Sequence, residues 1–236
     1  MVKFCGIEFR GLTTSDLFSQ GSGLSHITTV NAEYIVRVNE DRRFCQIVNR
    51  SIAIFDGQVP YLVARWLNKN VHFEKISGSD LIYKICELAA QRGERVFLLG
   101  GTKNSNKNSI GVLQAKYPGL CMKGFSPPFG PYPFQDTTNT SIIAQLQEIR
   151  PQYLLVGFGA VKQDYWIDDH RDILEALGVR FVVGVGGTFE MVSGEIKRAP
   201  RLMQYLGLEG VYRLVKEPKV FRLKRLMLSA RFLLYL

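Results

Sequence analysis

An acidic residue directly follows an apolar stretch near the end of the first quarter of the chain. Residues 52–55 are apolar and are followed by Asp56 and then Gly57, which permits a sharp turn. A carboxylate shielded by Phe55 and Tyr61 would lose part of its hydration, which raises its pKa and favours proton abstraction from a hydroxyl group. Asp56 is therefore a candidate general base, although a helix cap is an equally good interpretation.

A second segment of this kind contains Thr29 and Asn31, where an expected strand that begins at Ile27 ends in polar residues. In an open parallel sheet, ligands bind outside the carboxyl ends of the strands, and these two side chains would project there. Asn31 could instead cap a helix beginning at Ala32. Thr29 and Asn31 are thus candidate active-site residues, with the cap as the alternative.

Two glycine pairs follow apolar runs and could bring backbone amides close to phosphate groups. They are Gly100 with Gly101 and Gly186 with Gly187. A helix N-terminus after such a turn favours negative charge. Neither pair matches the full G-x-G-x-x-G pattern with its downstream acid, so the indication of a diphosphate site is weak, and tight turns would explain either pair.

Cations and an amide offer further candidates for holding a ligand. Lys162 and Gln163 follow another apolar run and could hold phosphate or sugar hydroxyl groups, unless they belong to a solvated first helical turn. Arg198 lies in residues 197–201, which contain three Lys or Arg. Arg198 and Arg213 could bind a diphosphate through forked hydrogen bonds, whereas such clusters are more often merely solvated.

The elements that must position these residues alternate between apolar runs and amphipathic stretches. Continuous apolar strands separated by helices indicate a largely parallel sheet with helices on both faces, a Rossmann-like α/β fold. The expected strands are residues 27–30, 52–55, 95–99, 153–157 and 179–184, and the expected helices include residues 32–38, 59–67, 81–91 and 141–149.

Two further segments complete the predicted organisation. Residues 124–133 contain four prolines and are expected to form an exposed loop, either a lid or a stiff connection. We predict one α/β domain over residues 1–193, followed by a basic helical appendage over residues 194–236. The appendage would cover a donor site and contact a membrane.

The positive charge of the protein is concentrated at its C-terminal end. Residues 195–236 carry ten Lys or Arg and three Glu, a net charge of +7 out of +9 for the chain. An anionic partner is expected there. Residues 222–236 have the spacing of a basic amphipathic helix, which either enters a membrane interface or docks on the body of the protein. The expected membrane contacts are Leu223, Arg225, Leu226, Met227, Arg231, Phe232 and Leu233.

Composition argues against several other classes of protein. The four Cys form no C-x-x-C pair and the three His show no ligand spacing, so we expect neither a disulfide scaffold nor a metal site. Residues 1–10 mix charges with apolar residues, unlike a secretion signal, and no run is long enough to span a membrane. Nucleic acid is not the expected partner, because the tail lacks interleaved exposed aromatics.

The order of many short motifs resembles the WecG/TagA/CpsF glycosyltransferase family over nearly the whole chain. The matching segments are residues 29–31 (Thr-Val-Asn), 56–57 (Asp-Gly), 78–81, 98–101, 117–119, 156–164, 184–190, 197–200, 203–204, 207–209, 212–214 and 217–218. Departures include Val161 where the family has proline and Glu190 where it has aspartate.

The resemblance implies an inverting, metal-independent glycosyltransferase without a cofactor, bound to the inner face of the cytoplasmic membrane. It would move N-acetylmannosamine or a related hexose from a UDP-sugar to a saccharide on undecaprenyl diphosphate, during assembly of a bacterial surface polysaccharide or teichoic acid. By this resemblance Asp56 is the general base, Thr29 and Asn31 surround the reacting sugars, and Gln163 contacts sugar or nucleotide. The terminal arginines, including Arg222, would close over the diphosphate.

The basic tail is also compatible with a different function. The alternative function is a non-enzymatic peripheral membrane or nucleotide-sugar-sensing module, which would keep the basic tail without needing a base at Asp56. A homo-oligomer is also expected.

Overall fold

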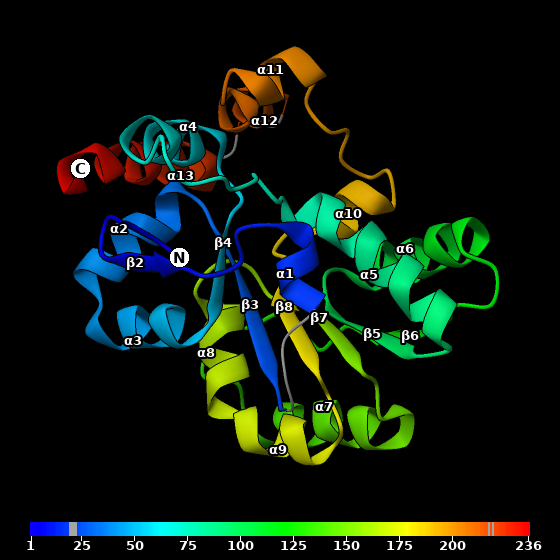
Figure 1. Cartoon of the computed structure of the whole chain (residues 1–236). Helices are drawn as coiled ribbons and strands as arrows, with labels where there is room; N and C mark the ends of the chain where they lie inside the picture. The colour runs from blue at the N-terminus through cyan, green and yellow to red at the C-terminus, as the bar shows by residue number, and fades with distance from the viewer. Residues whose placement is uncertain (19–22, 217, 219) are drawn as a thin grey trace. The chain divides into compact units, whose positions relative to one another are not determined.

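The protein is described here by a computed structural model that covers residues 1–18, 23–216, 218 and 220–236, without the side chains of residues 213 and 221. The chain divides into two compact units (Figure 1). Unit 1 comprises Met1–Ser19, Thr28–Ser77 and Arg198–Leu236, and unit 2 comprises Gln20–Ile27 and Gly78–Lys197. The basic tail therefore belongs to the same unit as Asp56, and the predicted boundary at residue 193 stays a prediction.

Unit 1 contains the N-terminal strands and the C-terminal helices. Its strand order is β1-β2-β4-β3, with β1 antiparallel to β2 and β2 parallel to β4. Its elements are β1 (Val2–Phe4), β2 (Ile7–Phe9), α1 (Thr14–Phe18), the end of β3 (Ser25–Val30), α2 (Ala32–Glu40), α3 (Arg42–Arg50), β4 (Ile52–Phe55), α4 (Gln58–Leu67), α11 (Arg201–Tyr205), α12 (Glu209–Lys216), α13 (Val220–Ala230) and the 3-10 helix η1 (Arg231–Tyr235).

The core of unit 1 contains an aromatic cluster at the end of β4. The ring of Phe55 stacks on Phe9 with 3.6 Å between centroids and on Phe73 at 5.1 Å. All three side chains are almost fully buried. Because Phe55 is the last residue of β4, this packing fixes the end of the strand immediately before Asp56.

Unit 2 contains the remaining strands in the order β3-β8-β7-β5-β6, in which β5, β6, β7 and β8 pair in parallel. The start of β3 joins this order, since Ser25 N donates to Arg180 O at 2.8 Å. The other elements are α5 (Gly78–Arg92), β5 (Arg95–Gly100), α6 (Lys103–Lys116), β6 (Cys121–Phe125), α7 (Asp136–Ile149), β7 (Tyr153–Gly157), α8 (Lys162–Asp169), α9 (Arg171–Ala176), β8 (Phe181–Gly184) and α10 (Thr188–Val192).

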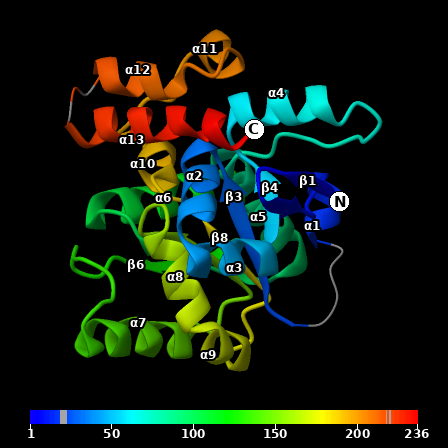
Figure 2. The same cartoon turned by 90° about the vertical axis from the view of Figure 1, so that its left-hand side faces the viewer.

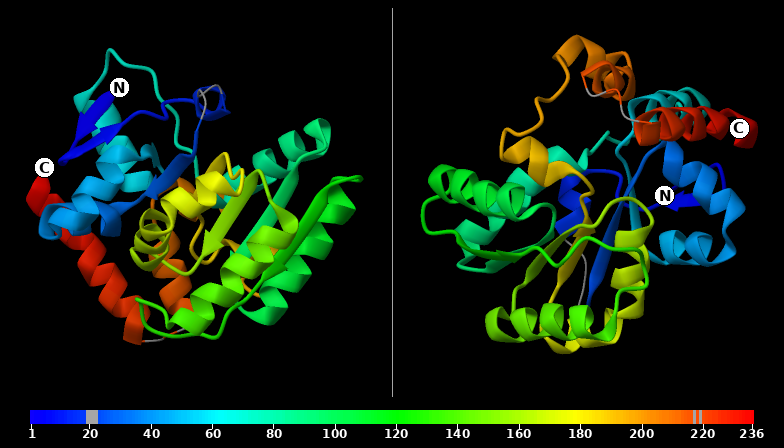
Figure 3. Two further views of the ribbon diagram at one scale, coloured as in Figure 1. Left: turned by 90° about the horizontal axis from the view of Figure 1, so that it is seen from below. Right: turned by 180° about the vertical axis from the view of Figure 1, so that it is seen from behind.

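Helices cover both faces of the strands of unit 2 (Figure 3). Phe97 and Leu154 pack in one buried cluster with Trp166 of α8 and with side chains of α7 and α9. Leu98 and Leu155 alternate with them and are equally buried, while α5 and α6 contact the same strands. The predicted α/β class, with mostly parallel strands, is confirmed.

Several elements were not predicted from the sequence. The hairpin β1–β2 has three residues in each strand, which is too short for an alternating pattern to register. The predicted strand over residues 179–184 begins only at Phe181, because Val179 N donates to Leu174 O.

Within the described residues, no helix combines the length and the apolar character needed to cross a bilayer.

The proline-rich segment forms a loop from residue 126 onward, as predicted. Its first two residues, Gly124 and Phe125, instead end the strand β6, which pairs with β5. The loop is fastened at its base, where Ser126 Oγ donates to Gly100 O at 3.0 Å. It is fastened again by Lys162 Nζ, which donates to Gly130 O at 2.8 Å.

Candidate functional site

Asp56 lies directly after β4, and its backbone is held by the end of β3. Val30 O accepts hydrogen bonds from Asp56 N at 2.9 Å and from Gly57 N at 3.3 Å. A Cβ at Gly57 would lie only 3.2 Å from Asn31 Cα, so glycine permits this close approach. Asp56 and Asn31 therefore lie together at the carboxyl ends of two adjacent strands, while their catalytic roles stay predictions.

Asn31 and Thr29 differ in how much of each side chain is open to a ligand. Asn31 Oδ1 accepts a hydrogen bond from Tyr34 N at 3.2 Å and caps α2, so the alternative interpretation as a helix cap is correct. A contact with a ligand would come from its Nδ2 amide. Thr29 is only 6% exposed and presents little surface in this structure.

Arg198 of the basic tail reaches the strand end that carries Asp56. Phe55 O accepts a hydrogen bond from Ile76 N at 2.8 Å, which aligns residue 76 with the end of β4. The next residue, Ser77, accepts a hydrogen bond on Oγ from Arg198 Nη2 at 3.3 Å. Sequence reasoning missed Ser77, although it directly precedes the Gly-Ser-Asp-Leu motif at residues 78–81.

The last helices of the tail dock along α2, the helix that Asn31 caps (Figure 2). Arg225 Nε and Nη2 both lie 2.8 Å from Oε2 of Glu33, which is 8% exposed in the first turn of α2. At the other end of α2, Glu40 pairs with Arg231 and accepts a hydrogen bond from Tyr235 OH at 2.9 Å. Tail and predicted base thus belong to one packed unit.

This docking corrects part of the predicted membrane surface. Phe232, predicted to contact a membrane, is instead 4% exposed, because η1 packs against α2. Leu226 is partly buried. Leu223, Met227 and Leu233 are exposed at 47%, 64% and 57%.

The described part of the structure does not test the predicted diphosphate binding by Arg213 and Arg222, the other two arginines assigned to it. Arg222 lies on α13 and is partly buried. Arg213 belongs to α12, but its side chain lies outside the described residues, as do Glu217 and Lys219 of the predicted motifs. The diphosphate contacts of Arg213 and Arg222 stay predictions.

The two glycine pairs form turns at strand ends of unit 2. Gly100 has φ +100°, and a Cβ there would lie 2.7 Å from Gly157 O. Gly101 N donates to the same oxygen at 3.1 Å, directly before Thr102 caps α6. Gly186 has φ +54° after β8 and is followed by Gly187 at the start of α10. The tight turns are real, and phosphate binding by them stays a prediction.

Gln163 supports one of these turns from inside the unit. Its side chain is 1% exposed, and its Oε1 accepts a hydrogen bond from Gly186 N at 3.0 Å. A Cβ at Gly184 would lie 2.4 Å from Gln163 Nε2, so only glycine fits beside the amide. Gln163 therefore holds the Gly186 turn, and the alternative of a solvated helical turn is wrong for this residue.

Lys162 is held by the proline loop. Besides donating to Gly130 O, its ammonium lies 4.7 Å from the ring centroid of Phe129. Partial burial lowers the pKa of Lys162 below its ordinary value. In this structure Lys162 stabilises the loop, and its predicted contact with a diphosphate stays a prediction.

Three buried polar residues of unit 2 that make specific contacts were not predicted from the sequence. Asn106 Nδ2 donates to Leu98 O at 3.0 Å and to Gly100 O at 2.9 Å, bracing the first glycine turn from one helical turn into α6. His26 Nε2 lies 3.5 Å from Oδ1 of Asp164, and both side chains are buried. Nothing in their spacing along the chain signals either arrangement.

The described part of the chain gathers no three His, Cys, Asp or Glu in a group that could hold a metal ion.

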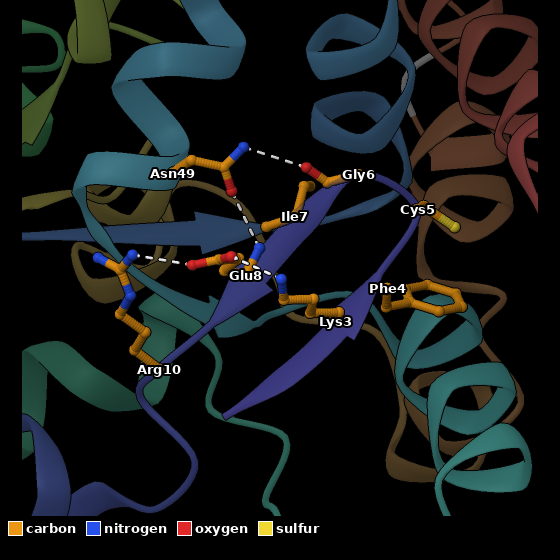
Figure 4. Close-up of a pocket in the computed structure, with 8 residues that line it drawn as sticks. All are labelled: Lys3, Phe4, Cys5, Gly6, Ile7, Glu8, Arg10 and Asn49. Carbon is orange, nitrogen blue, oxygen red and sulfur yellow. Dashed lines mark hydrogen bonds and ion pairs between the residues drawn. The ribbon is translucent and has the colours of Figure 1, made fainter.

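A cavity of about 570 Å³ lies elsewhere in unit 1, at the β1–β2 hairpin (Figure 4). It is lined by residues 3–8, Arg10 and Asn49, none of which is a predicted site residue. Its cations already pair with Glu8, at 3.1 Å from Lys3 and 2.9 Å from Arg10. Hydrogen bonds from Arg10 and then Lys3 lower the pKa of Glu8. The cavity therefore offers no obvious diphosphate site.

The mostly parallel strands with helices on both faces define the α/β class, in which ligands commonly bind outside the carboxyl ends of the strands. The comparison with protein families is more specific. Residues 2–236 match the "Glycosyl transferase WecG/TagA/CpsF family". The chain belongs to this family and is an enzyme, a hexosyltransferase, so the alternative of a non-enzymatic module is not supported.

Two curated relatives carry the same printed name, "N-acetylglucosaminyldiphosphoundecaprenol N-acetyl-beta-D-mannosaminyltransferase". The protein of Staphylococcus aureus (strain MRSA252) is 27% identical over 225 residues, which cover 95% of this chain and 82% of the relative. The protein of Bacillus subtilis (strain 168) is 27% identical over 208 residues, which cover 88% and 77%.

Proposed function

We propose that this enzyme transfers N-acetylmannosamine or a related hexose from a UDP-sugar to a saccharide carried on undecaprenyl diphosphate. The printed names of the two relatives support the sugar and the lipid-linked acceptor. Such a transfer would serve the assembly of a bacterial surface polysaccharide or teichoic acid.

Asp56 acts as the general base in this proposal. Its carboxylate takes the proton of the acceptor hydroxyl, whose oxygen then attacks the anomeric carbon from the side opposite UDP. The bond between the sugar and UDP breaks as the new glycosidic bond forms, so the configuration inverts. The supporting observation is the pair of hydrogen bonds to Val30 O, which holds Asp56 beside Asn31.

Fixed positive charge replaces a metal ion and any cofactor. UDP gains negative charge as it leaves, and guanidinium groups placed in advance stabilise that charge without reorganising. Arg198, held through Ser77 near the end of β4, supports this role. If a divalent metal is required, chelation with EDTA will abolish transfer.

The membrane setting follows from the acceptor. A polyprenyl chain keeps the acceptor in the bilayer, so the enzyme would work as a peripheral protein on the inner face of the cytoplasmic membrane. The net charge of +7 in residues 195–236 suits a surface of anionic lipid.

The decisive experiment measures UDP release with a lipid-diphosphate saccharide as acceptor across a panel of UDP-sugars. Asp56→Ala should lower the rate by roughly 10²–10⁴-fold, since the contribution of a positioned base is lost. Binding of the UDP-sugar should stay nearly unchanged, because the base acts on the acceptor.

Full activity of Asp56→Ala would remove this residue from its role. Absence of UDP release with every donor would refute the proposed reaction. A matched control is Asp172→Ala, which changes an exposed carboxylate of α9 in unit 2.

A further inference from the structure

Helix α4 packs Tyr61 against Phe55 and Phe73 but leaves other large apolar side chains exposed. Its buried residues are Pro60 and Ala64. In contrast, Trp66 is 69% exposed, Leu67 54% and Leu62 45%. A surface helix of a globular unit normally turns its large apolar residues inward. The exposed large apolar side chains indicate that this side of α4 meets an apolar environment.

The exposed side chains form one continuous stripe. Val59, Leu62 and Trp66 recur at helical spacing, with Leu67 next to them, and these four residues are the α4 face. The tail packs beside the start of this stripe, because a Cβ at Gly207 would lie 2.6 Å from Val59 Cγ2. The turn between α11 and α12 therefore lies against the start of α4.

The charged side chains of α4 and of the segment that follows it are positive. Residues 58–73 contain Arg65 and Lys69 but neither Asp nor Glu, and both cations are exposed. Arg65 Nη1 donates to Tyr61 OH at 3.2 Å, one helical turn away. An apolar helical face with tryptophan and flanking cations is typical of helices that lie in the headgroup region of anionic bilayers.

We propose that the α4 face is a membrane-binding surface that inserts among the headgroups of an anionic phospholipid bilayer. It is separate in sequence from the predicted contacts in residues 222–236 and adds a second point of attachment. The inference deepens the proposed function. It rests on that function for one premise, namely that the enzyme works at a membrane. A second copy of the chain is the competing occupant.

Trp66 provides a direct reporter, since the chain has two Trp and the other, Trp166, is 0% exposed. The full chain is mixed with vesicles of phosphatidylglycerol and phosphatidylcholine in equal parts, some carrying brominated acyl chains. The emission of Trp66 should shift to shorter wavelength and be quenched by bromine. Trp66→Phe should bind the vesicles but lose both signals.

Variants of the face then test its contribution to binding. Leu62→Gln with Leu67→Gln should weaken vesicle binding at least about fivefold, because apolar area that enters the interface is lost. Val112→Gln is the matched control, as Val112 is 42% exposed on α6 of unit 2. Circular dichroism checks that each variant is folded.

Three outcomes would overturn the proposal. They are absence of vesicle binding, binding without quenching of Trp66, and a spectral shift that follows protein concentration in the absence of lipid, which would identify a second copy as the occupant. Transfer measured in detergent tests the proposed function by itself. Loss of UDP release in detergent would contradict the proposed function, whereas loss of vesicle binding would contradict the membrane-binding surface. The two failures can therefore be told apart.

Discussion

Asp56 owes its position to main-chain hydrogen bonds at the end of β3. Because Val30 O accepts from both Asp56 N and Gly57 N, the turn after β4 is bound to the neighbouring strand. The sequence predicts that a carboxylate ends this strand, since an apolar run stops there. It does not predict Ser77 as the partner of Arg198, because residues 121 positions apart meet only through the fold.

Val161 is the residue whose backbone departs most from ordinary geometry near the predicted site. It has φ +69° and ψ −52°, and Lys162 N donates to Ala160 O at 2.9 Å across it. This is a γ-turn of the strained kind, which a β-branched residue adopts at a cost. Proline, the usual family residue here, cannot reach this φ because its ring holds φ near −65°.

Val161→Gly should therefore stabilise the protein. Relief of the strained φ, worth about 1–3 kcal/mol, should exceed the added entropy of the unfolded chain, and the free energy of unfolding should rise by about 1 kcal/mol. Denaturation in urea measures the change. The control is Val112→Gly in the exposed face of α6, which should cost about 1 kcal/mol. Equal destabilisation by both variants would show that Val161 is not strained.

At the scale of elements, both glycine turns of unit 2 are held by buried amide side chains, one from the helix that follows the same strand and one from the helix that follows the neighbouring strand β7. Asn106 of α6 braces the Gly100 turn, and Gln163 of α8 braces the Gly186 turn. Helices and strands themselves follow from the apolar pattern. These braces do not, because a buried amide and a solvated amide look alike in a sequence.

Gly100→Ala should destabilise the protein by about 2–4 kcal/mol, because a Cβ requires both a positive φ and an approach of 2.7 Å to Gly157 O. Thermal and urea unfolding measure the loss. Gly111→Ala is the matched control, since nothing lies within 4 Å of its Cβ position in α6. That variant should be neutral or stabilising by about 0.5–1 kcal/mol. Similar effects of the two substitutions would contradict the steric explanation.

At the scale of the whole molecule, the basic tail has two uses for its side chains. Phe232 is buried and Arg225 pairs with Glu33, so part of the tail docks on unit 1. Leu223 and Met227 point to the surface and remain available to a membrane. The amphipathic spacing of residues 222–236 is compatible with either use, so the sequence predicts both.

Removal of residues 221–236 should release the enzyme from anionic vesicles in proportion to the charge lost, and salt should weaken what binding remains. Cosedimentation at low and high salt measures this. Because the deletion also removes Phe232, Leu223→Gln with Met227→Gln provides a variant that leaves the docked face intact. Unchanged vesicle binding of both variants would refute the role of the tail.

Taken by itself, the sequence determined the α/β class, the strand ends that carry Asp56 and the glycine pairs, and the concentration of charge in the tail. These features follow from local periodicity and from residue order, both of which can be read from short segments of the sequence. The burial of Gln163 and Phe232 and the exposure of Leu62 and Trp66 on α4 become evident only in the folded chain. The physical reason is that burial depends on which distant part of the chain covers a residue. An amphipathic pattern shows that a face is apolar but does not identify the part of the chain that covers it.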